Sequence, residues 1–153
     1  MNEHDGCQKE VILKGHSRTL GPTAAMLLAG LVWGLSQKES PIVDFDCKKW
    51  FCQNLRDLSF GLGLTKFELM GAQKKLKKEG LIDATARYNS TLWLINLPKY
   101  ARFNEFVDAL DYASDEATFP LWEVWKKEHS AISKEFGHLI SEKSRFGKFF
   151  GVV

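Results

Sequence analysis

Cysteine is scarce in this chain of 153 residues. Its three cysteines form no Cys-x-x-Cys pair and leave one thiol over in any disulfide pairing, which favours a reducing compartment. The three are Cys7, Cys47 and Cys52. Zinc binding by Cys47 and Cys52 with a distant histidine needs an unusual fold, so we interpret both as buried structural thiols on an amphipathic helix.

Long apolar runs are also missing. The longest run, Ala24 to Leu35, is shorter than the roughly 20 residues that a membrane helix needs. No charged leader with a cleavage site opens the chain. We therefore expect a cytoplasmic protein with no membrane partner.

Motifs of common enzymes are missing as well. Gly61-Leu62-Gly63 is followed by Lys66 where a dinucleotide fingerprint needs glycine, and no phosphate-binding Gly-x4-Gly-Lys-Ser/Thr loop is present. The sequence contains four histidines, which are scattered along the chain: His4, His16, His129 and His138. We expect no enzyme, no cofactor and no metal, and we expect His129 to be packed or paired rather than catalytic.

Charge is strongly segregated, although the net charge is only +2. Residues 65–102 hold eight basic side chains and three acidic ones, whereas residues 103–125 hold six acidic side chains and no basic one. A protein that docks on phosphates needs such a local positive field, whatever its overall charge. The length and a hydrophobic content of 44% fit one globular domain, alone or with a helical appendage.

The segment that precedes and includes this basic region predicts two helices joined by a tight turn. Gly63-Leu64 supplies the turn, Thr65 can cap the second helix, and Gly80 can end it. One face of the first helix carries Leu55, Leu58 and Leu62. Together these signals predict a helix-turn-helix.

A hairpin is predicted directly after it. Leu81-Ile82 begins a short strand, Arg87 to Ser90 forms a polar tip, and Leu92 to Leu97 forms the returning apolar strand. A helix-turn-helix followed by such a hairpin is a winged helix. The expected fold class is therefore mainly α with a small antiparallel β wing.

Upstream, the arm over residues 1–18 is polar except for Val11-Ile12-Leu13, which either pairs as a short strand or packs as an arm. A helix from Pro22 to about Ser36 is apolar nearly all round and is predicted to be the central buried helix. Pro41 to Phe45 alternates like a short strand. Asp46 can cap a helix over 47–62, whose length leaves open a break into two helices.

Downstream, Phe103 to Leu110 repeats apolar residues at helical spacing, and an acidic loop over 111–116 follows. A three-and-four alternation then predicts one long helix, although Gly137 weakens its continuity. Its seam consists of Trp122, Trp125, His129, Ile132, Phe136, Leu139, Lys143 and Phe146. The seam is expected to bury either against a second protomer, giving a homodimer, or against the protomer's own domain. We expect a winged-helix domain over 1–99 and a C-terminal helical extension over 100–153.

The second helix of the predicted helix-turn-helix, Thr65 to Glu79, has one side that faces the preceding helix and carries Leu69, Ala72, Gln73 and Leu76. The opposite side would enter the major groove of DNA, and the hairpin tip would contact the minor groove or phosphates. The predicted DNA-contacting residues are Thr65, Lys66, Phe67, Met70, Gly71, Lys74, Lys75, Lys78, Arg87, Tyr88, Asn89 and Ser90. Lysine-rich faces are also common on solvated helices, and Phe67 can instead be a protein contact.

The run Leu58 to Ile82, with its Leu-x-Leu-Thr turn and its Lys-Lys-Leu-Lys-Lys-Glu-Gly-Leu-Ile ending, resembles winged-helix domains of plasmid and phage replication proteins. It is more loosely similar to bacterial winged-helix repressors. With Ala24 to Leu35 and Ile42 to Trp50, the resemblance extends over residues 11–97 to the amino-terminal domain of RepA-type replication initiators. Gln73 departs from the apolar residue usual at its position, and the chain lacks a complete initiator's length.

The resemblance implies sequence-specific binding of double-stranded DNA, at the origin of a plasmid, phage or other mobile element. A transcriptional repressor of a mobile element is the first alternative. A protein-interaction module such as a helicase loader, whose lysines are only solvated, is the second.

Overall fold

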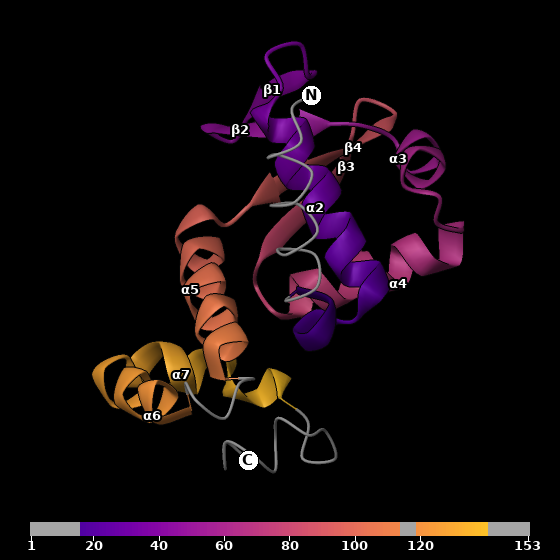
Figure 1. Ribbon diagram of the computed structural model, residues 1–153. Coiled ribbons are helices and arrows are strands. Elements are labelled where there is room, and N and C mark those ends of the chain that lie inside the picture. Colours follow the sequence, from indigo (N-terminus) through magenta and orange to yellow (C-terminus); the bar gives the residue numbers. More distant parts are fainter. Residues whose placement is uncertain (1–15, 114–118, 141–153) are drawn as a thin grey trace. The chain divides into compact units, whose positions relative to one another are not determined.

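The computed structural model describes residues 16–113 and 119–140 and shows a mainly helical chain with a small four-stranded antiparallel sheet (Figure 1). The chain forms two compact units, Met1–Lys99 and Tyr100–Val153, and each is described by itself. Most of the predicted amino-terminal arm, Val11 to Leu13 included, lies outside the described residues. No helix in the described ranges is both long and apolar enough to cross a bilayer.

Helix α2, Pro22–Ser36, is the central helix of the first unit, as predicted. It contacts helices α3 and α4 and strands β2 and β4, whose bounds follow below. Two glycines permit this close packing. A Cβ at Gly30 would lie 2.7 Å from the Leu62 side chain, and a Cβ at Gly34 would lie 2.9 Å from the Phe51 ring.

A hairpin replaces the first part of the helix that we predicted over residues 47–62, whereas residues 55–62 are helical as predicted. Strand β1, Ile42–Phe45, pairs antiparallel with β2, Lys48–Cys52. The residues between them, Asp46 and Cys47, have φ of 53° and 60°, so Asp46 turns the chain and caps no helix. The thiol prediction was also wrong, because Cys47 is exposed on this turn and Cys52 is half-buried in a strand.

Two helices joined by a short turn follow the hairpin. Helix α3, Leu55–Leu62, is capped by the Asn54 side chain and ends at Gly63, whose φ is 68°. Helix α4, Lys66–Lys78, begins after Thr65, as predicted. Gly80, with φ of 74°, then reverses the chain direction.

The second hairpin consists of β3, Ile82–Arg87, and β4, Ser90–Ile95, and the sheet order is β1-β2-β4-β3. The two turn residues between them both have φ of 55°, which matches a two-residue hairpin turn. Strand β4 stops two residues before the predicted end, because Leu97 already belongs to helix α5, Leu97–Ala113. Buried Trp93 fixes β4 in place, because its Nε1 donates to the Gln53 carbonyl at 2.9 Å.

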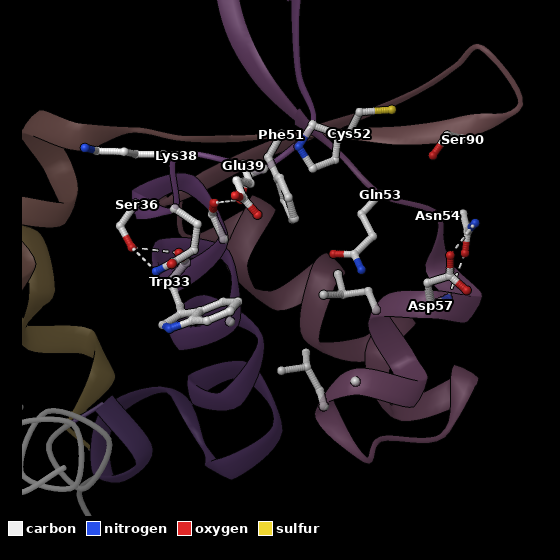
Figure 2. A pocket seen from close by; sticks show the side chains of 18 residues that line it. Trp33, Ser36, Lys38, Glu39, Phe51, Cys52, Gln53, Asn54, Asp57 and Ser90 are labelled. Carbon is white, nitrogen blue, oxygen red and sulfur yellow. Dashed lines mark hydrogen bonds between the residues drawn. The ribbon is translucent and has the colours of Figure 1, made fainter. Parts of the chain in front are cut away.

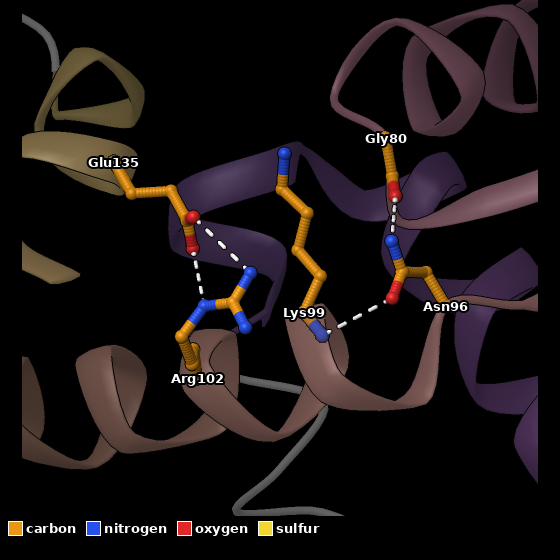
Figure 3. A network of polar contacts seen from close by, with 5 residues as sticks. All are labelled: Gly80, Asn96, Lys99, Arg102 and Glu135. Atoms are coloured by element: carbon orange, nitrogen blue, oxygen red, sulfur yellow. Dashed lines mark hydrogen bonds and ion pairs between the residues drawn. The ribbon is translucent and has the colours of Figure 1, made fainter.

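Figure 3 shows how the start of α5 is held at the end of the first unit. The Asn96 side-chain amide donates to the Gly80 carbonyl at 3.3 Å, and its oxygen accepts from the Lys99 amide at 3.3 Å. In the second unit, Figure 3 also shows Arg102 paired with Glu135 through two contacts of 2.9 and 3.2 Å. That hydrogen bonding raises the pKa of Arg102.

The long carboxy-terminal helix that we predicted is interrupted in the second unit. Helix α6, Phe119–Glu128, is followed by α7, Ser130–Phe136, and a 3-10 turn, Gly137–Leu139. His129 between the helices has φ of −120° and ψ of 47°, which is not helical. The predicted seam members Lys143 and Phe146 lie outside the described residues.

Aromatic side chains form the core of the second unit. Phe106 of α5 contacts Trp122 and Phe136, with ring centroids 6.2 and 5.7 Å apart. His129 stacks on Trp125 at 4.7 Å, so it is packed, as predicted. The predicted seam is therefore covered in part by α5 of the same unit.

Candidate nucleic-acid interface

Helix α4 has one buried face and one exposed face. Leu69, Ala72 and Leu76 are buried, and Gln73 beside them is half-buried. These residues recur three and four positions apart, which places them on a single side of the helix. Three of the four residues predicted to face the preceding helix thus belong to the core.

The opposite face exposes cations together with large apolar side chains. Phe67 is 88% exposed and Met70 is 48% exposed. The exposed lysines predicted to contact DNA are Lys66, Lys74, Lys75 and Lys78. One continuous surface of α4 therefore carries most of the residues predicted as the site.

The start of α4 is held by a reciprocal capping pair. The Thr65 hydroxyl oxygen accepts from the Glu68 amide at 3.1 Å, and the Glu68 carboxylate accepts from the Thr65 amide at 3.0 Å. This pair satisfies amides that would otherwise lack partners at a helix start. It also holds the one carboxylate within α4 at the first turn, away from the lysines of the last two turns.

Lys77 differs from the other lysines of α4 in having a contact within the fold. Its Nζ donates to the Ala84 carbonyl of β3 at 3.2 Å, which ties the last turn of α4 to the second hairpin. All four lysines of the cluster, Lys74, Lys75, Lys77 and Lys78, are exposed.

Gly71 is exposed in the middle of α4. A Cβ at this position would meet nothing within 4 Å, in contrast to Gly30 and Gly34 of α2. A mid-helix glycine costs about 1 kcal/mol relative to alanine. Packing within the described residues gives no reason for that cost.

The tip of the second hairpin holds the remaining predicted residues. Tyr88 is 68% exposed, and Arg87 and Asn89 are exposed beside it. Left-handed φ values at Tyr88 and Asn89 make the tip a tight two-residue turn, from which these two side chains project. The Arg87 guanidinium instead lies over the Phe45 ring of the first hairpin, with its Cζ 4.8 Å from the ring centroid. Ser90, the first residue of β4, is half-buried.

An open groove of about 920 Å³ lies between the end of α2, β2 and α3 (Figure 2). Trp33, Phe51 and Leu58 supply apolar lining, and the groove also includes Ser90. Ser90 therefore lines this groove as well as adjoining the hairpin tip.

Across the described ranges, no group of three or more His, Cys, Asp or Glu side chains is placed to hold a metal ion.

Phe60 is a candidate residue that the sequence reading missed. It is 90% exposed, on α3 near the turn that leads into α4. The signal was present in the sequence, because Phe60 lies two positions from both Leu58 and Leu62. That spacing points away from the apolar face of the helix.

Comparisons with protein-family models, curated proteins and solved structures find no match to this chain.

Proposed function

We propose that this chain binds double-stranded DNA as a winged helix, with α4 as the recognition helix and the β3–β4 hairpin as the wing. The observation that carries the proposal is the exposed face of α4. There Lys74, Lys75 and Lys78 stand beside Phe67, opposite a side that is built into the core. Major grooves about 12 Å wide admit one α-helix, and lysines beside the groove can neutralise phosphates.

Two features separate this surface from an ordinary solvated helix face. Phe67 gains nothing from exposure to water, and Gly71 weakens the helix with no steric need within the described residues. A partner that covers this face accounts for both features, because it would remove the Phe67 ring from water and could approach the helix closely at Gly71. Because the face is also cationic, a polyanion is the partner that its charge complements.

For the biological role, we propose origin recognition in replication initiation of a plasmid, phage or other mobile element. The support is the resemblance of Leu58 to Ile82 to winged-helix domains of replication proteins. A transcriptional repressor of such an element is the alternative within the same class. Footprints over directly repeated sites near an origin favour the initiator, and a footprint over a promoter palindrome favours the repressor.

A mobility-shift series on random-sequence duplex DNA over a range of salt concentrations tests DNA binding itself. If the four α4 lysines predicted to contact DNA and Arg87 each neutralise one phosphate, log K falls against log salt with a slope of about −4.5, near −0.9 per phosphate. Absence of binding even at low salt would show that the lysines are only solvated.

A protein-interaction module, such as a helicase loader, is the second candidate. The exposed rings of Phe60 and Phe67 favour it, because exposed aromatic side chains are enriched where proteins contact each other. On this reading Phe60→Ala and Phe67→Ala abolish capture of the partner. DNA affinity would be absent in the wild-type chain.

Homodimerisation is proposed through α6. Leu121 is 61% exposed and Val124 is 53% exposed, three positions apart on this helix. They are apolar residues that the core of the second unit does not use. Dimers suit DNA with two half-sites, because the second contact becomes intramolecular.

A further inference from the structure

We propose that the first half of the exposed α4 face selects thymine by contact with its 5-methyl group, through Phe67, Met70 and Gly71. This inference rests on the proposed DNA-binding function and adds a base preference to it. It also predicts that the protein prefers DNA to an otherwise identical duplex that contains uracil.

The geometry divides the α4 face into two halves. Phe67, Met70 and Gly71 are three and four positions apart, so they share one side of the first half of the helix. Lys74 and Lys78 continue that line at four-residue intervals through the second half. An apolar end is thus followed by a cationic end along one strip of surface.

The chemistry of the apolar end limits what it can read. Phe67 and Gly71 have no side-chain hydrogen-bonding group, and the Met70 thioether is only a weak acceptor. Most base-edge groups in the major groove are hydrogen-bond donors or acceptors, and the apolar exception is the thymine methyl. Phe67, 88% exposed in the free chain, loses water-exposed area when it contacts such a methyl.

Gly71 supplies the room for this contact. Since a Cβ there meets nothing within 4 Å, the missing side chain leaves the surface of α4 open rather than relieving a clash inside the described protein. Helix backbone can approach a base edge more closely at glycine than at any other residue. The lysines that follow hold phosphates, which makes duplex DNA the occupant that fits both halves.

In vitro selection from a random duplex library, followed by single thymine-to-uracil replacement in the selected site, tests the proposal. Uracil lacks only the 5-methyl group. We expect each contacted position to lose about fourfold in affinity, the factor for one buried carbon. Replacements outside the footprint should have no effect.

Variants assign the effect to the apolar end. The double variant Phe67→Ala/Met70→Ala should bind thymine and uracil sites equally, because both side chains that sense the methyl are gone. Lys74→Ala should weaken both sites by the same factor, because a phosphate contact does not distinguish the bases. Persistent discrimination by the double variant would overturn the assignment.

Two glycines provide a matched pair for the close approach. Gly71→Ala should raise the Tm, because alanine favours helix and meets no neighbour, yet it should lower affinity for the selected site at least tenfold. Gly61→Ala, in α3 beside the groove, also meets nothing within 4 Å. It should not lower the Tm and should leave affinity unchanged.

The remaining outcomes separate this inference from the proposed function. Equal affinity for thymine and uracil sites, or undiminished binding by Gly71→Ala, overturns this inference and leaves DNA binding intact. Tighter binding to single-stranded DNA also overturns it, because Phe67 would then stack on an unpaired base. No duplex binding at low salt overturns the inference and the proposed function together.

Discussion

The α5–α7 unit and the α3–α4 helix pair place their aromatic side chains in opposite ways. In the α5–α7 unit, Phe103, Phe106 and Trp122 are almost fully buried and touch other rings. In the α3–α4 pair, Phe60 and Phe67 are about nine-tenths exposed. The chain thus buries aromatic residues where they hold helices together, and the exposed pair lies where a partner is proposed to bind.

Charge follows the same division. The exposed face of α4 places Lys74 and Lys78 beside Phe67, whereas in the second unit Arg102 is paired with Glu135 and Lys126 with Glu123. Paired surface charges add little to stability and attract few counterions. An excess of cations beside an apolar side chain is therefore the property that distinguishes α4.

The largest expected effect is on stability. Phe106→Ala should lower the free energy of unfolding of the second unit by about 3–5 kcal/mol, because it empties a ring cluster. Phe67→Ala should change stability by no more than about 0.5 kcal/mol, because its ring is exposed. Chemical denaturation followed by tryptophan fluorescence measures both. Similar losses in the two variants would contradict the assignment of Phe67 to a binding surface.

An intermediate effect is expected for assembly. Leu121→Asp with Val124→Asp should convert a dimer to a monomer and lower affinity for DNA with two half-sites by about 100-fold, through lost effective concentration. Affinity for a single half-site should be unchanged. Light scattering gives the mass, and exposed Lys134→Glu on α7 serves as control. A wild-type chain that stays monomeric on two-site DNA would rule out the dimer.

The smallest expected effect concerns the hairpin tip. Arg87→Ala should weaken DNA binding less than the loss of an α4 lysine and reduce the salt slope by about one unit, because one phosphate contact is lost. Lys49→Ala, exposed on the other hairpin, should change neither quantity. Unchanged affinity and slope in Arg87→Ala would mean that the β3–β4 hairpin is structural only.

The sequence predicted α4 and its neighbours well because local chemistry determines them. Thr65 and Glu68 cap the helix within four residues, Gly63 and Gly80 take left-handed conformations, and the Leu69 side alternates at helical spacing. None of these features depends on distant contacts. The exposed α4 residues of the candidate site could be placed for the same reason.

Two other predictions, the helix directly after Asp46 and the unbroken carboxy-terminal helix, were wrong for identifiable reasons. The first hairpin turns at Asp46 and Cys47, neither of them glycine, so the usual turn signal was absent and a strand was predicted as helix. At the carboxy-terminal end, the apolar spacing continues across His129, although its backbone breaks the helix. Spacing counts residues and does not record a change of axis, so the break could not be seen.

Charge reversal at Lys74 tests the central claim, that the exposed face of α4 binds duplex DNA, most directly. Lys74→Glu should abolish mobility shifts on DNA, because a carboxylate would meet phosphate at close range, and circular dichroism should be unchanged because Lys74 is exposed. Lys134→Glu, exposed on α7, changes the net charge equally in the other unit and should bind as wild type. A folded Lys74→Glu protein that binds DNA with wild-type affinity would contradict the account.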